Sequence, residues 1–457
     1  MVVLMKNMSL LSKRILLLDA MLLILLAGYV LAGVENVPFH GDESTTIWMS
    51  RDFATTILEG DIQAVTYQPP PRRTTEQHMQ VITGNLAKIT MGVAWHNTGF
   101  HGDDLNDQWV WGLDIEWNRA NGHMPSDRLL LMTRLSSAVL LIVSTALVMA
   151  MTRWVANQLF AHRLISAAAS WLSAILYALN PVILMNGRRA MFEGAMLFGV
   201  ALVGWGTLRQ VNRRSSLKGD VLIGAAAGIA LSAKHSTVFT IALLFIGLSV
   251  VEWGSSKNQP KQWYQLSSKF IMPMLTALFV FLALTPLWWS NHLLEMPRIT
   301  LDERQKILDE QVALFGGYDG WGQRLEGLWQ RSFGVEPQYY EADYWGDYAG
   351  VADEISDYES SHLAGITLPV MPMIRVALVV AGLFAMGFGW WHGQKNIVGV
   401  LALWVIGICL ISLITTPLNW QRYYLPIQPP LSMVMGLGGA ALLQLVLYRE
   451  RLKHDAV

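Results

Sequence analysis

The sequence predicts an all-α polytopic membrane protein, and two observations lead to that prediction. Of the 457 residues, 53% are hydrophobic and 15% are charged, whereas a soluble chain carries roughly 25% charged residues. The apolar residues are also grouped in long runs, and a run of about 18 or more is long enough for a helix to cross a bilayer. We therefore expect an integral membrane protein with about ten or more transmembrane helices.

Ten apolar spans follow one another along the chain. They cover about 15–33, 129–151, 164–185, 191–208, 221–233, 236–253, 270–290, 368–391, 396–416 and 425–448. The fifth span is short, and Gly224 and Gly228 give it the GxxxG pattern of a close helix contact. The first run could instead be a cleaved signal peptide, since "VLAG" offers a small-residue cleavage site. We favour a retained span because the run is long.

Lysine and arginine gather in the short loops that ten spans place on one side of the membrane. These residues are Lys6, Lys13, Arg14, Arg209, Arg213, Arg214, Lys218, Lys257, Lys261, Lys269, Arg449, Arg451 and Lys453. Because cytoplasmic loops carry an excess of Lys and Arg, this side is predicted to be cytoplasmic, and both termini lie on it.

Two long segments then lie outside, at 34–128 and 292–367. The first carries 13 acidic residues and the second 15, which is 28 of the 34 in the chain. Loops of this length are uncommon without a function. The first suits helices lying in the membrane interface, and "TLDERQKILDEQVALF" in the second predicts an amphipathic helix with Thr300 as its N-cap. The chain thus divides into a membrane module with the first outer loop (1–291), a partly helical second outer loop, and C-terminal membrane helices (368–457).

Several classes of function have no support. The sequence contains no Walker-A loop, dinucleotide fingerprint or HExxH motif, and no clustered basic stripe that would bind nucleic acid. The single cysteine, Cys409, permits neither an internal disulfide nor a cysteine metal site. Asp103 and Asp104 could hold a cation, but isolated acidic pairs in loops are usually only solvated. No cofactor and no required metal are predicted.

The stretch "FHGDESTTIW" places His40, Asp42 and Glu43 just beyond the first span. An acidic pair in that place is more often solvated than catalytic. A carboxylate there can nevertheless accept a proton from a hydroxyl group that approaches along the membrane surface. His40 would tune such a site or hydrogen-bond an acceptor.

Cationic residues stand at the ends of several other spans. Arg134 lies a turn or two inside the second span, where a charge is costly and so a functional candidate, and it could bind phosphate through two parallel hydrogen bonds. Arg189 and Glu193 are four residues apart and are expected to share a helix face. Lys234 lies between two apolar runs, and Arg422 lies at the outer mouth of the last span. Each of these residues could instead snorkel to the membrane surface or lie in an ordinary loop. Taken together, the cations suit a substrate with a lipid tail and an anionic phosphate head.

Several segments, in order, resemble the membrane-embedded glycosyltransferases of the protein O-mannosyltransferase type, which in bacteria are the phospholipid-carrier-dependent glycosyltransferases. The segments are "FHGDESTTIWMSRDF", "TYQPPPRRTTEQHMQVITGNLAKITMG", "NRANGHMPSDRLLLMTRLSSAVLL", "ALNPVILMNGRRAMFEGAMLFGVAL", "GAAAGIALSAKHSTVF" and "RYYLPIQPPLSMVMGLG". The resemblance covers most of the chain outside 292–367. Its most specific element is the Asp-Glu pair.

The resemblance implies a C-type glycosyltransferase fold and a monosaccharide donor, such as mannose, on a polyprenyl phosphate. It also implies an inverting displacement on the outer face of the plasma membrane, with an acid of the first outer loop as the base. Carried over, that acid is Asp42 or Glu43, and we favour Asp42 with Glu43 supporting it. The other candidates are the donor phosphate-binding residues Arg134, Lys234, Arg189 and Arg422, with Arg134 alternatively bracing the acid, and the supporting residues His40 and Glu193. The hydroxyl acceptor, whether protein, glycan or lipid, stays open.

Two other functions compete with a transferase. A membrane transporter or lipid flippase should show repeated spans, and the two long outer loops break any such symmetry. An inactive relative that serves as an assembly scaffold also fits the sequence.

Overall fold

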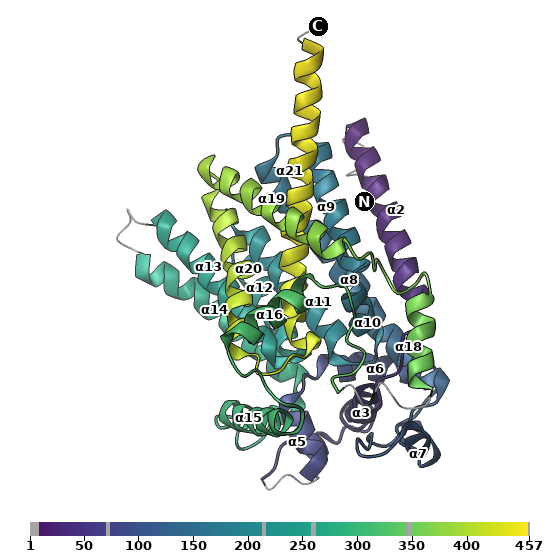
Figure 1. Cartoon of the computed structure of the whole chain (residues 1–457). Helices are drawn as coiled ribbons and strands as arrows, with labels where there is room; N and C mark the ends of the chain where they lie inside the picture. The colour runs from purple at the N-terminus through teal and green to yellow at the C-terminus, as the bar shows by residue number, and fades with distance from the viewer. Residues whose placement is uncertain are drawn as a thin grey trace.

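The computed structural model describes residues 9–69, 74–212, 216–256, 262–342, 345 and 350–455, which form helices and no strand. The long helices, in chain order, are α2 (Leu10–Ala32), α8 (Asp127–Leu159), α9 (Arg163–Ala178), α10 (Pro181–Arg188), α11 (Phe192–Gln210), α12 (Leu217–Ala233), α13 (Val238–Ser256), α14 (Gln262–Leu284), α19 (Met371–Trp391), α20 (Lys395–Thr415) and α21 (Gln428–Asp455). In Figure 1 they run between two ends of the molecule, with the C-terminus of α21 at one end. The prediction of an all-α fold is confirmed.

Each of the ten predicted spans falls on one or two of these helices. Within the described residues, six helices are long and apolar enough to cross a membrane by themselves, and one bent pair raises the number to seven. The predicted count of ten is therefore not confirmed. The third predicted span, 164–185, is not one continuous helix: α9 and α10 are bent by 60° against each other. The bend falls at Asn180 and Pro181, because a proline ring cannot continue a preceding helix.

Helices α12 and α14 pack closely at the two glycines of the predicted GxxxG pattern. A Cβ atom on Gly224 would lie 2.5 Å from the backbone oxygen of Pro273, and one on Gly228 would lie 2.6 Å from that of Ala277. Both acceptors belong to α14. The GxxxG face predicted on α12 is thus a helix–helix contact, and any larger residue would force the two helices apart.

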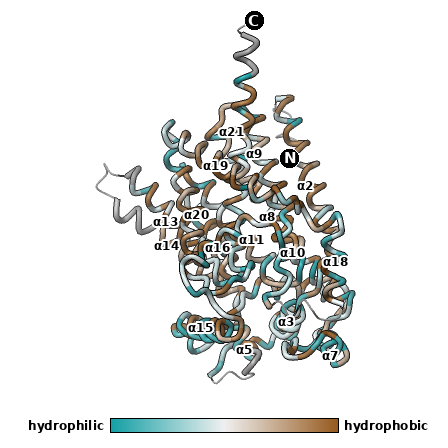
Figure 2. The backbone as a smooth tube through the Cα atoms, viewed as in Figure 1, coloured by the Kyte–Doolittle hydropathy of each residue, from teal (hydrophilic) through white to brown (hydrophobic). Residues whose placement is uncertain are grey.

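The two long segments predicted to lie outside also fold into helices. The first segment contains α3 (Gly41–Met49), η1 (Ala54–Leu58), α4 (Ile62–Val65), α5 (Thr74–Ile82), α6 (Leu86–Asn97), η2 (Gly102–Asp104) and α7 (Ile115–Ala120). The second contains α15 (Met296–Phe315), α16 (Trp321–Phe333) and α18 (Val351–Ser360). Of these helices, α3, α5, α7 and α15 lie at the end of the molecule opposite the C-terminus (Figure 1). Figure 2 shows mostly hydrophobic helices in the bundle and hydrophilic backbone around α5, α7 and α15. The prediction of helices in the first outer loop is confirmed.

The predicted N-cap of the amphipathic helix is wrong. Helix α15 begins at Met296, with Glu295 as its N-cap and a proline in its first turn. Pro297 is well placed there, because its fixed φ angle suits a helix start and the missing N–H needs no partner. Thr300 consequently lies inside the helix and is 9% exposed.

Some of the Lys and Arg residues that predict the orientation lie outside the described residues. Lys6, Arg213, Arg214, Lys257 and Lys261 lie there, as do residues 70–73 of the Pro-Pro segment. Which side of the membrane is cytoplasmic stays a prediction, and so does the division of the chain at 291 and 367.

Candidate functional site

The first turn of α3 fixes the acidic pair through its own caps. His40 is the N-cap residue, and its ring Nδ1 accepts a hydrogen bond from the Asp42 amide at 3.0 Å. The Glu43 side chain reaches back and accepts one from the His40 amide at 3.1 Å. This reciprocal capping satisfies helix-end donors that would otherwise be orphaned. It turns Asp42 and Glu43, neighbours in sequence, toward different surroundings.

Glu43 points into the protein interior and is 0% exposed. Its two oxygens accept hydrogen bonds from Arg134 Nε and Nη2, both at 2.7 Å, and a third comes from the Ala190 amide at 2.8 Å. Burial alone would raise the pKa of Glu43, but the charges of Arg134 and Arg189 and these hydrogen bonds hold it below its usual value. Glu43 is therefore an ionised anchor that joins α3 to α8 and to the α10–α11 link.

Asp42 faces the other way and is the more exposed acid, with 25% of its side chain accessible. It forms an ion pair with Arg422 of η5 (Gln421–Ile427). Arg422 also pairs with Glu341, at 3.1 Å from Nε to Oε1, and Glu341 in turn contacts His40 Nε2 at 2.9 Å. Burial would raise the pKa of Glu341, but Arg422 and His40 hold it well below its usual value. Three segments far apart in sequence thus meet in one charged chain.

A second charged pair stands at the break between α12 and α13. Lys234 is the C-cap residue of α12, with extended backbone, and the short η3 (His235–Thr237) follows it. Its ammonium group donates to Glu193 Oε1 at 2.7 Å. Glu193 lies in the first turn of α11 and is 2% exposed, whereas 21% of the Lys234 side chain is accessible. Lys234 is therefore the more accessible member of the pair.

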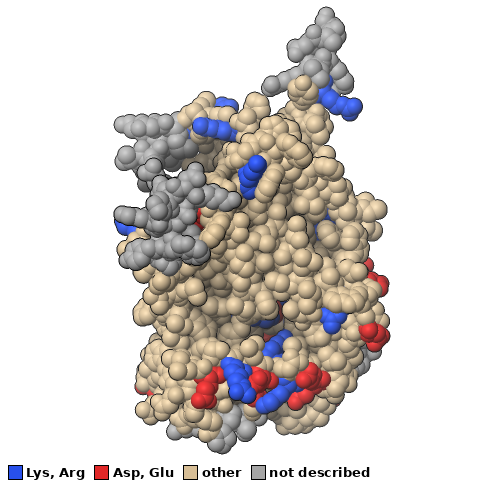
Figure 3. Space-filling view, turned by 90° about the vertical axis from the view of Figure 1, so that its left-hand side faces the viewer, with Lys and Arg blue, Asp and Glu red and all other residues tan. Residues whose placement is uncertain are grey.

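Residues of both charged groups, Asp42, Glu341 and Arg422 of the first and Glu193 and Lys234 of the second, line one large cavity of about 750 Å³. Its walls come from α3, α5, α11, α15, α20 and the α12–α13 link, and they are mostly apolar, with residues such as Met196, Leu308 and Ile411. In Figure 3 the face that is turned to the viewer has a hollow in its lower half, with Lys or Arg atoms in its depth, beneath a surface band with few charges. A cavity of this size and composition suits an amphiphilic ligand with an anionic end.

The structure separates the predicted site residues into two groups. Asp42, Glu193, Lys234 and Arg422 line the cavity, and His40, Glu43, Arg134 and Arg189 lie behind its wall. Arg134 is 3% exposed and donates hydrogen bonds to Glu43. This contact corresponds to the second role predicted for Arg134, in which it braces the acid and does not bind the donor phosphate.

The expectation that Arg189 and Glu193 share a helix face is wrong. Arg189 follows the end of α10 with extended backbone, and α11 begins only at Phe192. Its guanidinium donates to the backbone oxygens of Pro38 and Tyr339, each at 3.0 Å. Arg189 therefore joins the first outer segment to the second and does not pair with Glu193.

Two polar residues of this region, Glu341 and Arg304, were not predicted from the sequence, and His235 was noted only as the neighbour of Lys234. Glu341 lies in an acid-rich loop without periodicity, so nothing distinguished it from its neighbours. Arg304 lines the cavity from α15 and donates to the Tyr423 hydroxyl at 3.1 Å, and the amphipathic pattern of α15 could have indicated it. His235 also lines the cavity and follows the predicted Lys234 directly.

No group of three or more His, Cys, Asp or Glu side chains suited to a metal ion occurs among the described residues. Asp104 instead caps its own short helix by accepting a hydrogen bond from the His101 amide at 2.7 Å.

The helical bundle and its charged cavity define a polytopic integral membrane protein. Residues 107–301 match the family model described as dolichyl-phosphate-mannose-protein mannosyltransferase, which confirms the resemblance to the protein O-mannosyltransferase family over that part of the chain. The matched part contains Arg134, Arg189, Glu193 and Lys234. The acidic pair of α3 precedes it.

Solved structures with similar folds come from a yeast and a bacterium. The Saccharomyces cerevisiae protein O-mannosyltransferase Pmt1–Pmt2 complex bound to the sugar donor is 16% identical over 59% of this chain and 33% of its own, with a TM-score of 0.43. ArnT from Cupriavidus metallidurans is 14% identical in its apo state, over 92% of this chain and 59% of its own (TM-score 0.48). Bound to undecaprenyl phosphate, it is 14% identical over 95% and 63% (TM-score 0.46). This chain thus spans between 33% and 63% of the matched structures, and no curated protein sequence matches it.

Proposed function

We propose that the protein is a glycosyltransferase that moves a monosaccharide from a polyprenyl phosphate to a hydroxyl acceptor on the outer face of the membrane. The observation that carries the proposal is the cavity, whose mostly apolar lining includes charged side chains, among them the carboxylate of Asp42 and the cations Arg422 and Lys234. Apolar walls fit a polyprenyl chain and the cations fit its phosphate. The family match supports a sugar linked to that phosphate, and mannose is the sugar that the family description names.

In the proposed reaction Asp42 is the general base. The acceptor hydroxyl gives its proton to the Asp42 carboxylate, and its oxygen forms a bond to the anomeric carbon of the donor sugar. The bond from that carbon to the phosphate oxygen breaks, and the electron pair leaves with the polyprenyl phosphate. Displacement from the opposite face inverts the anomeric centre. Asp42 suits this role because it lines the cavity, whereas Glu43 has its oxygens occupied by Arg134 and backbone amides.

Arg422 and Lys234 are proposed to hold the donor phosphate. A guanidinium and an ammonium held in fixed positions stabilise the charge that grows on the leaving phosphate. Each cation already has a carboxylate partner, Arg422 with Asp42 and Glu341 and Lys234 with Glu193. These partners keep the cations in place when no donor is bound.

The test uses purified protein in detergent with a radiolabelled polyprenyl-phosphate hexose and cell-envelope acceptors. We expect Asp42→Asn to lower transfer by about 10²- to 10⁴-fold, the usual contribution of a general base, while donor binding is not weakened. Arg422→Gln and Lys234→Gln should weaken donor binding. Asp103→Asn, an exposed acid outside the cavity lining, serves as the matched control. Undiminished transfer by the Asp42 variant would remove it from the reaction.

The outer-face assignment has its own test. A cysteine placed at Glu354, in the second outer segment, should react with a membrane-impermeant maleimide added outside intact cells. Labelling only after the cells are opened would reverse the proposed orientation.

A further inference from the structure

Seven aromatic side chains form a continuous row of ring contacts along the cavity, and we call this row the aromatic wall. In contact order its members are Phe39, Trp109, Trp111, Trp345, Phe315, Trp420 and Tyr423, with neighbouring ring centroids 4.4 to 6.3 Å apart. Five of them, from Trp111 to Tyr423, line the cavity. They come from the first outer segment, the second outer segment and the link before α21, so the wall exists only in the folded chain.

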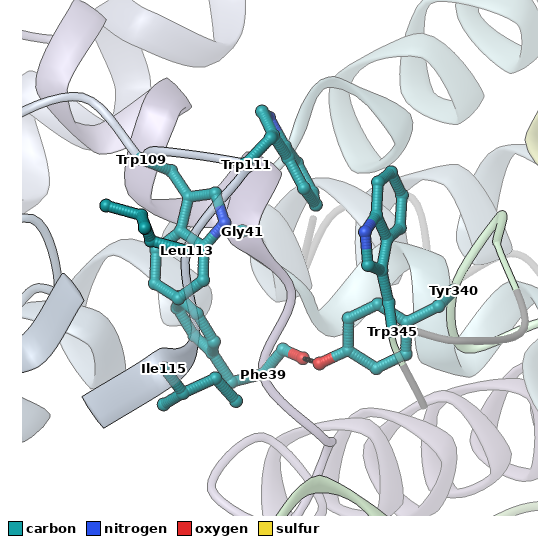
Figure 4. Close-up of a pocket in the computed structure, with 8 residues that line it drawn as sticks. All are labelled: Phe39, Gly41, Trp109, Trp111, Leu113, Ile115, Tyr340 and Trp345. Atoms are coloured by element: carbon teal, nitrogen blue, oxygen red, sulfur yellow. Dashed lines mark hydrogen bonds between the residues drawn. The ribbon is translucent and has the colours of Figure 1, made fainter. Parts of the chain in front are cut away.

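The aromatic wall passes directly beside the proposed base. Trp111 and Trp345 line both the cavity and a small neighbouring pocket of about 10 Å³, which Figure 4 shows with Phe39, Gly41, Trp109 and Tyr340 around it. Gly41 borders the small pocket, whereas the next residue, Asp42, borders the cavity. A Cβ atom on Gly41 would lie 2.6 Å from the Trp109 indole. The peptide that carries Asp42 is thus pressed against the wall.

Charged groups are interleaved with the rings of the aromatic wall. The Arg422 guanidinium lies 5.0 Å from the centroid of Trp420, and the His40 ring lies edge-on to Trp111 at 5.6 Å. Trp420 is 4% exposed and firmly packed, whereas Trp111 is half-buried and keeps part of its surface toward the cavity. A ligand on this wall therefore meets flat aromatic surface and hydrogen-bonding groups together.

This combination selects a chemical class of ligand. The face of an aromatic ring carries partial negative charge, and the flat face of a sugar ring presents C–H groups with partial positive charge, so the two stack. The hydroxyl groups at the edge of the same sugar can reach carboxylates and guanidinium groups. A Ser or Thr peptide could use the same hydrogen-bonding groups, but its backbone has no flat face of C–H groups to stack on the rings.

Resting on the proposed function, we propose that the hydroxyl acceptor is a saccharide, which stacks on the aromatic wall at Trp111 and presents an edge hydroxyl to Asp42. The polyprenyl chain of the donor is proposed to contact aliphatic lining residues of the same cavity, such as Met196, Leu308 and Ile411. The reaction is the one given above, with a sugar hydroxyl as the group that loses its proton to Asp42.

Saccharide binding can be measured without transfer, by saturation-transfer NMR on the full chain in detergent. The probes are neutral trisaccharides built from mannose, galactose or glucose, each titrated with and without polyprenyl-phosphate hexose. We expect at least one trisaccharide to bind, and Trp111→Ala to weaken that binding about fivefold to tenfold. Trp111→Phe keeps a ring face and should lose less. Trp391→Ala, which removes a tryptophan that is 87% exposed on α19, should change nothing.

Transfer assays then compare the trisaccharides with a Ser/Thr-rich peptide. Label on the trisaccharide, with a raised acceptor KM and unchanged donor affinity in Trp111→Ala, supports the proposal. Absence of trisaccharide binding, or binding that Trp111→Ala does not weaken, overturns it. Label on the peptide alone also overturns it. A fall in donor affinity in Trp111→Ala would show that the aromatic wall binds the polyprenyl chain, and this result would also overturn the proposal. If the wild-type protein does not bind polyprenyl-phosphate hexose, the proposed function is contradicted. The saccharide titration without donor still tests whether the aromatic wall binds a saccharide.

Discussion

Replacing Glu43 with glutamine should destabilise the protein far more than a single lost hydrogen bond would. Four donors converge on the two carboxylate oxygens: Arg134 Nε and the Ala190 amide on Oε1, and Arg134 Nη2 and the His40 amide on Oε2. A glutamine side chain has one oxygen and one NH₂ group. In either orientation, one Arg134 bond and one backbone amide bond are lost.

The magnitude follows from these losses. A hydrogen bond to a charged group contributes about 1.5–3 kcal/mol, and an orphaned buried donor costs about 1–3 kcal/mol. The charge of Arg134, which is 3% exposed, also loses its counter-ion, and breaking a buried ion pair from one side costs about 3–5 kcal/mol. These effects overlap because they concern the same atoms, so we expect a total of about 3–5 kcal/mol for Glu43→Gln.

The assay is unfolding in mixed micelles, followed by tryptophan fluorescence. Glu43→Asp keeps the charge and should lose less stability. Asp104→Asn is the matched control, because it alters an exposed carboxylate that caps a short helix in the same way, and surface changes of this kind cost about 1 kcal/mol or less. If Glu43→Gln unfolds like the wild type yet transfers no sugar, then Glu43 acts in the chemistry and its assignment as an anchor is wrong.

Three further predictions concern pH and packing. The folded-state pKa values of Glu43 and Glu341 are both lowered. The stability that these two residues contribute is therefore present above the usual carboxyl pKa and is lost as pH falls below about 4.5. Unfolding midpoints measured from pH 7 to 3 should show this loss, and Glu341→Gln should make the midpoint depend less on pH. Gly41→Ala should displace the first turn of α3 from Trp109 and lower transfer more than donor binding, which separate kcat and binding measurements would reveal. Gly228→Leu should separate α12 from α14 and lower the unfolding midpoint, and an unchanged midpoint would contradict the close contact.

The membrane helices could be predicted because a bilayer fixes their length and composition. Apolar runs therefore located every long helix, although they could not show the bend at Pro181 or how many helices cross alone. The start of α15 was placed too late, because the Thr300 capping pattern competed with Pro297, and the proline prevailed.

Half of the predicted site residues line the cavity and half lie behind its wall, and the two groups differ in where their side chains find partners. Lys234 and Arg422 stand where helices break, and both line the cavity while they pair with carboxylates. Arg134 and Glu43 carry equally conspicuous charges but neutralise each other across 91 positions of sequence, which no local pattern encodes. Glu341 was missed for the same reason, because its importance comes from Arg422 and His40, both remote in the chain.

The ion pair between Asp42 and Arg422 has a consequence for the timing of the proposed reaction. While Asp42 is ionised, it competes with the donor phosphate for the same guanidinium. When Asp42 takes the acceptor's proton it becomes neutral, and its hold on Arg422 weakens. At that moment the departing phosphate gains a second negative charge, so the released cation moves to where charge has just appeared. Proton transfer and leaving-group departure would then be coupled through one arginine, and Arg422→Lys should slow single-turnover chemistry more than it weakens donor binding.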